Sequence, residues 1–139
     1  MLKSIQWNES LATGIEEIDN DHKKLISFYN DFFAACLSSM GQEVVNTTLN
    51  NLIEYTKYHF QHEEELMKKE NYPGLAEQKS EHEKLLQTTL ELQDKVRQGF
   101  SENVSNNVLV FLNNWLETHL MSLDADFAKF VHKSHESIE

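Results

Sequence analysis

"HFQHEEELMKKENYPGLAEQKSEHEKLL", residues 59–86, decides the fold because it contains two helical patterns separated by one turn. The four residues "NYPG" at 71–74 combine proline and glycine, which break helices, and they are the strongest turn signal in the chain. We therefore expect one helix over about residues 43–70 and the next over about residues 75–98. A short connection between two long helices makes them antiparallel neighbours.

The rest of the chain extends this pattern to four long helices. Asp19 is expected to cap a first helix over about residues 19–37, which "SSMG" at 38–41 ends with a glycine. Ser101 or Ser105 is expected to cap a fourth helix over about 105–120, and a short helix over about 125–132 follows. The preceding arm, about residues 1–18, carries apolar side chains that should pack onto the bundle, namely Ile5, Trp7, Leu11, Ile15 and Ile18.

These elements predict an all-α protein, in which residues 1–139 form a single domain. The expected architecture is an up-down-up-down antiparallel four-helix bundle with an N-terminal arm and a short C-terminal helix. The composition agrees, because 40% of the residues are hydrophobic and only four glycines and one proline interrupt the helical patterns.

The bulk charge restricts the partners of the protein. A formal net charge of -11 argues against nucleic acid and anionic membranes, since both are polyanions. Cys36 is the only cysteine, and "MLKSIQWNES" at the amino terminus lacks the apolar core of a signal peptide. No stretch approaches the roughly 18 apolar residues of a membrane span. We therefore expect a soluble cytoplasmic protein, and we expect it to be a monomer.

Polar residues fall on the inward face of each long helix when about 100° is allotted to each residue. His62 lies at the edge of the apolar stripe of its helix, and Glu64 and Glu65 point toward solvent. The inward polar residues are His22 in the first helix, His59 and Glu63 in the second, Gln78 and His82 in the third, and His119 in the fourth.

A metal ion would explain why these residues share one interior. A single inward histidine is more often a core residue bonded to a backbone carbonyl, but here all four helices supply one. A buried Glu63 carries a large desolvation cost, and no inward lysine or arginine is available to neutralise it. Neutral imidazoles supply nitrogen ligands, and the carboxylate supplies charge and can bridge two ions. The alternative is a metal-free bundle with a few buried polar residues.

Asp124 has two possible roles. It follows His119 by five residues, so a continuous helix would carry it about 140° away from that histidine. A break at "MSLDAD", residues 121–126, would let Asp124 turn back toward the same centre. Asp124 would equally well cap the short last helix. The sequence leaves both interpretations open.

Four segments together resemble the bacterial hemerythrins, which are oxygen-binding, non-haem diiron four-helix bundles. These segments are "WNESLATGIEEIDNDHKKL" at 7–25, "HFQHEEELM" at 59–67, "NYPGLAEQKSEHEKLL" at 71–86 and "WLETHLMSLDADF" at 115–127. The resemblance implies two iron ions joined by an oxo or hydroxo bridge, and it favours Asp124 as a ligand. The implied ligands are His22 and His59 for one iron, His82 and His119 for the other, and Glu63 and Asp124 as carboxylates that bridge both.

One position departs from the family pattern. The third helix of the family carries two inward histidines four residues apart, and the first of these is Gln78 in "QKSEH" at 78–82. An amide oxygen is a weaker donor than imidazole for a mid-series divalent metal. Three outcomes are therefore open for Gln78: its oxygen coordinates the metal, a water takes its place, or the second metal binds loosely. Glu77 and Glu81 flank this position but lie off the stripe.

The resemblance implies reversible dioxygen binding for carriage, storage or delivery, which is not enzymatic catalysis. Alternatively, the altered ligand set favours a redox-active iron enzyme that turns over peroxide or nitric oxide, or a module that responds to dioxygen, nitric oxide or peroxide. A ferritin-like oxidase is disfavoured because none of the inward histidines has a glutamate three residues before it. Iron itself rests on the resemblance, since these ligands also suit zinc or manganese.

The remaining candidates have ordinary explanations. His132 and His135 are expected to be exposed on the last helix, within a frayed tail "HKSHESIE" at 132–139. His62 is a surface residue that would bind only stray metal. Trp7 and Trp115 are expected to pack against the bundle, and Tyr29 is expected to lie in the core.

Overall fold

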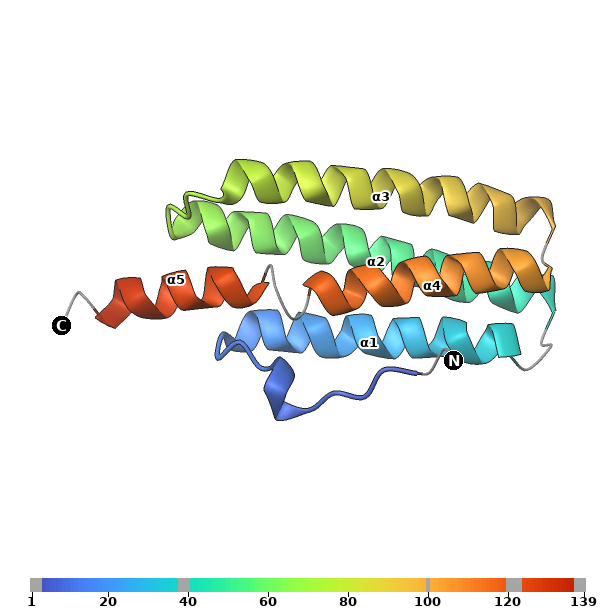
Figure 1. Cartoon of the computed structure of the whole chain (residues 1–139), viewed down its shortest axis with the longest axis horizontal. Helices are drawn as coiled ribbons and strands as arrows, with labels where there is room; N and C mark the ends of the chain where they lie inside the picture. Colours follow the sequence, from blue (N-terminus) through green and yellow to red (C-terminus); the bar gives the residue numbers. More distant parts are fainter. Residues whose placement is uncertain (1–3, 38–40, 100, 120–123, 137–139) are drawn as a thin grey trace.

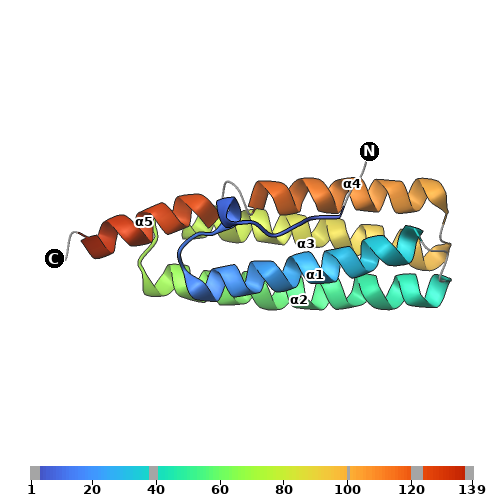
Figure 2. The ribbon, with the colours of Figure 1, turned by 90° about the horizontal axis from the view of Figure 1, so that it is seen from below.

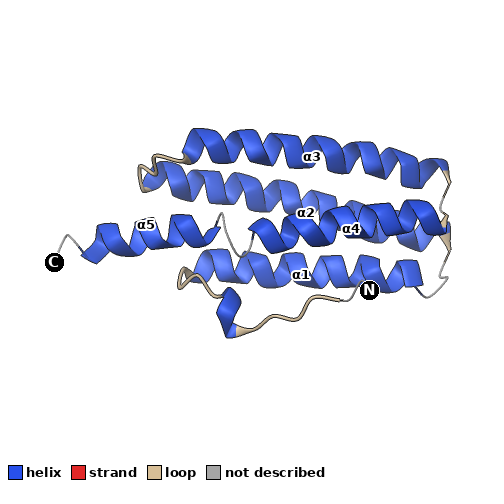
Figure 3. Ribbon diagram, in the orientation of Figure 1, coloured by secondary structure: helices blue, strands red, loops and turns tan. Residues whose placement is uncertain are grey.

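Four long helices lie side by side and alternate in direction along the chain (Figure 1). The computed structural model describes residues 4–37, 41–99, 101–119 and 124–136. The helices are α1 (Glu16–Leu37), α2 (Gln42–Lys69), α3 (Leu75–Gln98) and α4 (Glu102–Thr118), and α5 (Asp124–Glu136) extends beyond the end of the bundle. The described residues contain no strand (Figure 3). The predicted all-α class and four-helix bundle are therefore confirmed.

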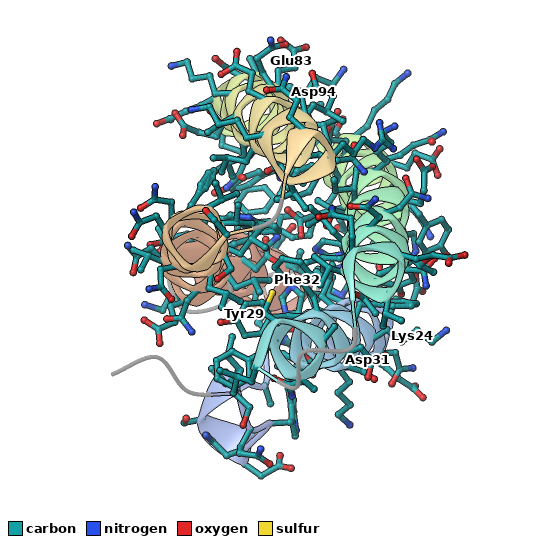
Figure 4. The ribbon with its side chains drawn as sticks, turned by 90° about the vertical axis from the view of Figure 1, so that its right-hand side faces the viewer. Lys24, Tyr29, Asp31, Phe32, Glu83 and Asp94 are labelled. Carbon is teal, nitrogen blue, oxygen red and sulfur yellow. The ribbon has the colours of Figure 1, made fainter. Side chains whose placement is uncertain are left out.

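Apolar side chains fill the space between the helices. Viewed along the bundle, Tyr29 and Phe32 point inward from α1, whereas Glu83 and Asp94 point away from the outer side of α3 (Figure 4). Tyr29 and Phe32 are fully buried, and they belong to a large apolar cluster that reaches all four helices.

A second, smaller apolar cluster lies at the end of the bundle where α5 begins, and it consists of Ile18, Met67, Phe127 and Val131. On α1, His22 lies between Ile18 of the smaller cluster and Leu25 of the larger cluster. On α2, Glu63 lies between Phe60 of the larger cluster and Met67 of the smaller cluster. The buried polar residues therefore occupy a layer with apolar packing on both sides.

The arm runs along the outside of the bundle and is fastened to α1 (Figure 2). The Ile5 backbone N–H donates to Asn30 Oδ1 at 2.9 Å, and Asn30 Nδ2 donates to the Ile5 carbonyl at 2.8 Å. Between these contacts and α1, the arm forms the short 3-10 helix η1 (Glu9–Leu11). The expected packing of the arm is therefore observed, and Ile5 adds to the larger apolar cluster.

The first helix begins at Glu16, ahead of the predicted cap Asp19. The Asp19 carboxylate accepts hydrogen bonds from the backbone N–H and the hydroxyl of Thr13, both at 2.8 Å, and from the Gly14 N–H at 3.3 Å. Asp19 therefore holds the turn that precedes α1 and does not cap the helix from outside.

Two other predicted boundaries also differ, at the start of α4 and at the end of α5. Of the two serines proposed as caps, Ser101 is the one that accepts from the Val104 N–H, at 3.2 Å, so α4 begins at Glu102. The glycine expected to end the first helix, Gly41, precedes α2 with a φ of 99°, and residues 38–40 lie outside the described ranges. The last helix continues to Glu136, so residues 132–136 are helical and not frayed.

Within the described ranges, no helix combines the length and the apolar composition that a membrane crossing requires.

Candidate metal centre

Five side chains converge in the buried polar layer. Their ligand atoms all lie within 4.8 Å of one another, and each of the five residues is 0% exposed. We call this group the central cluster. It consists of His22 from α1, His59 and Glu63 from α2, His119 from the end of α4, and Asp124 from the start of α5.

The helical repeat accounts for the contribution of α2. His59 and Glu63 are four residues apart, about one helical turn, and therefore lie on the same face. His59 Nε2 is 3.0 Å from Glu63 Oε2, and the same nitrogen is 3.0 Å from His119 Nε2. Through these contacts, side chains from α2 and α4 meet at one point inside the bundle.

The interruption between α4 and α5 accounts for Asp124. His119 occupies the C-cap position of α4, α5 begins with Asp124, and residues 120–123 lie outside the described ranges. Asp124 Oδ2 is 3.0 Å from His119 Nε2 and also contacts His22 Nε2. The carboxylate therefore points back toward the bundle axis. This agrees with the interpretation in which Asp124 turns toward the same centre as His119.

His82 and Gln78 approach the central cluster from α3. His82 is 2% exposed, and its Nε2 lies 3.3 Å from Glu63 Oε1. Gln78 is 5% exposed and lies one helical turn before His82, but it is not part of the central cluster. Both residues were predicted to belong to the site. His82 contacts the central cluster through Glu63, whereas Gln78 lies next to the cluster without belonging to it.

The carboxylates of the central cluster are ionised in the metal-free protein. Burial and the neighbouring Asp124 raise the pKa of Glu63, but the His119 and His59 imidazoles outweigh them and lower it to about 2. Burial also raises the pKa of Asp124, but hydrogen bonds and charge from His119 and the other imidazoles hold that pKa well below its ordinary value.

The histidines respond in two ways. Burial lowers the pKa of His119, but the Asp124 and Glu63 carboxylates raise it to about 9. The pKa of His59 is likewise raised well above its ordinary value despite burial, whereas burial lowers the pKa of His22. In the absence of a metal, protons on imidazoles therefore balance the carboxylate charge, and these are the positions that a cation would take over.

Several buried polar atoms have no hydrogen-bond partner in the metal-free protein. Their chemistry shows whether the site fits a cation. They include Glu63 Oε1 and Oε2, Asp124 Oδ1, His82 Nε2 and Gln78 Oε1, and also the Nδ1 atoms of His22 and His119. Buried carboxylate oxygens without donors are costly, and no lysine or arginine is buried among the described residues. Imidazole nitrogens and carboxylate oxygens are suitable ligands for iron, zinc or manganese. The residues present therefore fit a metal ion.

Asp21 is a site residue that the sequence interpretation missed. It is 6% exposed, and its Oδ2 lies 3.0 Å from His59 Nδ1 and 2.6 Å from His62 Nδ1. Tyr55 donates its hydroxyl proton to Asp21 Oδ1 at 3.1 Å. An available signal was its spacing of three residues after the buried Ile18, which places Asp21 on the same side of α1.

The prediction that Glu64 points toward solvent was wrong, because its carboxylate contacts His82. Its Oε2 lies 2.8 Å from His82 Nδ1, and its side chain is 24% exposed. A residue next to the inward stripe of α2 reaches α3 because these two helices pack against each other. The prediction holds for Glu65, which is exposed.

The remaining candidates lie outside the central cluster. His132 and His135 are exposed, as predicted, and contact the Thr13 carbonyl and the Glu70 carboxylate respectively. His62 is half-buried at the edge of α2, between the Asp21 and Glu17 carboxylates. Packing positions are observed for the aromatic residues: Trp115 and Tyr29 are buried in the larger apolar cluster, and Trp7 is half-buried with Lys23 Nζ 5.1 Å from its ring centre.

Comparison with known proteins places this geometry in context. The sequence model of the Hemerythrin HHE cation binding domain matches residues 13–131. A bacteriohemerythrin of Stenotrophomonas maltophilia is 32% identical over 129 residues, which cover 93% of this chain and 82% of that protein. A bacteriohemerythrin of Pseudomonas aeruginosa is 30% identical over 130 residues, with 92% and 82% coverage. The crystal structure of wild-type hemerythrin superimposes with a TM-score of 0.82 at 26% identity, covering 91% of this chain and 97% of that chain.

Proposed function

This chain belongs to the hemerythrin family, and we propose that it is a non-haem diiron protein that binds dioxygen reversibly. The convergence of the central cluster supports the proposal most strongly, because two fully buried carboxylates meet three fully buried imidazoles at one point, where a cation would balance the carboxylate charge. We assign His22 and His59 to one iron and His82 and His119 to the other, with Glu63 and Asp124 shared by both. Gln78 is a further candidate ligand through its amide oxygen.

When bound, an iron pair would supply the two electrons that dioxygen takes up on binding, and would recover them on release. The chain contributes orientation first. The Asp21 carboxylate only accepts hydrogen bonds, so it holds a proton on His59 Nδ1 and directs His59 Nε2 into the central cluster. Glu64 holds the corresponding proton on His82 Nδ1 and directs His82 Nε2 toward Glu63.

The chain also contributes exclusion of water. Leu25 and Phe60 pack on one side of the polar layer, and Ile18 and Met67 pack on the other. Each of these four side chains is at most 4% exposed. A dry, apolar environment limits the access of water and protons to the site. It therefore favours release of intact dioxygen over irreversible oxidation of the metals.

Anaerobic loading with Fe(II), followed by repeated addition and removal of dioxygen, tests this function. We expect a visible absorption band that appears with dioxygen and disappears when dioxygen is removed. The variant Glu63→Gln should lose the band because it loses a shared ligand charge, whereas Glu65→Gln, an exposed neighbour, should keep it. Wild-type protein that binds iron but shows no reversible band would contradict dioxygen binding.

Gln78 favours a second candidate, a redox-active iron enzyme acting on peroxide or nitric oxide. Its Oε1 has no hydrogen-bond partner, and it stands where the family pattern has an imidazole. A weaker donor leaves the second metal more open to an added ligand. Turnover rates of iron-loaded wild type and Gln78→His separate the two candidates. Rates that do not fall in Gln78→His would count against the enzyme.

A further inference from the structure

Two hydrogen bonds join Tyr55 on α2 to the central cluster. The Tyr55 hydroxyl donates to Asp21 Oδ1 at 3.1 Å, and the other oxygen of that carboxylate, Asp21 Oδ2, lies 3.0 Å from His59 Nδ1. His59 belongs to the central cluster. A hydrogen-bonded path therefore leads from a proposed metal ligand to a phenol at the interface between α1 and α2.

Tyr58 continues this path to the surface. It is 53% exposed, and its ring centre lies 5.4 Å from the ring centre of the half-buried Tyr55. At this spacing the two aromatic rings are in contact. An open hollow of about 330 Å³ lies beside them and is lined in part by both residues. We call Tyr55 and Tyr58 the tyrosine pair, whose outer member is accessible to soluble molecules.

The other two tyrosines of the chain do not form such a path. Tyr29 is fully buried, and its hydroxyl accepts from the Asn113 amide at 3.4 Å. Tyr72 packs against Phe127 and Phe130 at the end of the bundle. Among the described residues, Tyr55 is the one tyrosine whose hydroxyl donates to a carboxylate.

The contact with Asp21 makes Tyr55 suited to losing an electron and a proton together. Loss of an electron makes the hydroxyl proton of a phenol strongly acidic, so a base that takes up this proton makes the oxidation easier. Burial and the Asp21 carboxylate raise the pKa of the Tyr55 hydroxyl to about 13, so the proton is in place before oxidation. The 3.1 Å separation from Asp21 Oδ1 is short enough for direct proton transfer.

We propose that the tyrosine pair is a radical relay, which carries the oxidising power of hydrogen peroxide from the metal site to the protein surface. This inference rests on the proposed diiron function. Dioxygen that leaves the site after taking up two electrons and two protons is hydrogen peroxide, so the proposed function itself supplies the oxidant. Reduction of one peroxide at the metals takes up two more electrons and two more protons and yields two water molecules.

The relay supplies these electrons one at a time. An electron leaves Tyr55 along Asp21 and His59 toward the metals, while the hydroxyl proton of Tyr55 moves to Asp21 Oδ1. Tyr58 then gives an electron to Tyr55, which takes its proton back from Asp21, and the Tyr58 proton passes to water. A soluble one-electron reductant, such as a thiol or a small phenol, restores Tyr58. Two such cycles reduce one peroxide.

Addition of hydrogen peroxide to the iron-loaded chain without a reductant tests this relay. Freeze-quenched samples are measured by electron paramagnetic resonance for a tyrosyl radical. Later samples are measured by fluorescence and peptide mass spectrometry for dityrosine, which forms when the Tyr58 radicals of two chains join their rings through a carbon–carbon bond. Iron content and circular dichroism check that each variant binds metal and folds.

We expect the wild type to show the radical and a covalent dimer joined at Tyr58. Tyr58→Phe should keep a radical on Tyr55 but lose the dimer, and Tyr55→Phe should lose both. Tyr72→Phe is the matched control, since it removes the hydroxyl of a tyrosine at the other side of the polar layer, and it should behave as wild type. Metal-free protein should form neither product.

A Tyr55→Phe variant that binds iron and still forms as much radical and dimer as the wild type would overturn the relay. Iron-loaded wild type that binds dioxygen reversibly but forms no tyrosyl radical would also overturn it, and would leave the proposed function intact. Wild-type protein that binds no iron would instead refute the proposed function itself.

Discussion

Asp21 and His59 face each other across the interface between α1 and α2, with Asp21 Oδ2 3.0 Å from His59 Nδ1. Burial raises the pKa of Asp21, but hydrogen bonds from His59 and His62 lower it below the ordinary value, so the carboxylate stays ionised. The orientation of a proposed metal ligand therefore depends on a residue that is itself outside the central cluster.

Asp21→Asn should weaken metal binding about tenfold, because the imidazole of His59 becomes less basic and less firmly oriented. Titration against a chelator of known affinity measures this change. Asp31→Asn is the matched control, since Asp31 is exposed on the same helix (Figure 4). Equal affinities in these two variants would show that Asp21 does not position His59.

Glu64→Gln should act on only one of the two metal positions. Glu64 Oε2 is 2.8 Å from His82 Nδ1, whereas Asp21 serves His59. We expect about a tenfold loss of affinity for the second metal, with the first unchanged. Stepwise binding measured by isothermal titration resolves the two metals, and the exposed neighbour Glu65 supplies the control Glu65→Gln. An equal loss at both positions would be inconsistent with the assignment.

Gln78→His should strengthen the second metal position by about tenfold, because imidazole is the better donor for mid-series divalent metals. The side chains are similar in size, so the bundle should tolerate the change. Metal content per chain after dialysis against a weak chelator gives the result. Unchanged retention of the second metal would mean that residue 78 does not face it.

The stability of the metal-free protein should fall as the pH rises from 6.5 to 9. The pKa of His119 is raised from 6.5 to about 9, so its proton stabilises the fold below pH 6.5 and is lost as the pH passes 9. The lowered pKa of His22 acts in the opposite direction, but only near the lower end of this window, where the unfolded chain still binds that proton. Thermal unfolding at several pH values measures the effect.

Metal-loaded protein is the control for this pH dependence. A bound cation already takes the place of the His119 proton. The melting temperature of the metal-loaded protein should therefore change little over the same pH range. Metal-free protein whose melting temperature stays constant or rises between pH 6.5 and 9 would contradict the assigned proton.

The inward residues were predictable because helical periodicity is a local property. His59 and Glu63 share a face of α2 whatever lies opposite, so the sequence alone places them on the axis. The turn at residues 71–74 was also local, and α3 begins at Leu75 as predicted.

The supporting contacts were not predictable in the same way. Asp21 and Glu64 each contact a histidine on a neighbouring helix, and such contacts depend on how two helices pack. Asp124 depended on the interruption after α4, which periodicity marks but does not orient. The hydrogen bond that Thr13 donates to Asp19 was likewise missed, because a capping residue and a first-turn residue have the same composition signal.

The central claim is that buried imidazoles and carboxylates from α1, α2, α4 and α5, together with His82 from α3, hold a pair of iron ions. Native mass spectrometry of the Fe(II)-loaded chain counts the bound metal directly. Our account predicts two iron ions per chain in the wild type and their loss in Glu63→Gln. A folded wild-type chain that carries no iron would contradict it.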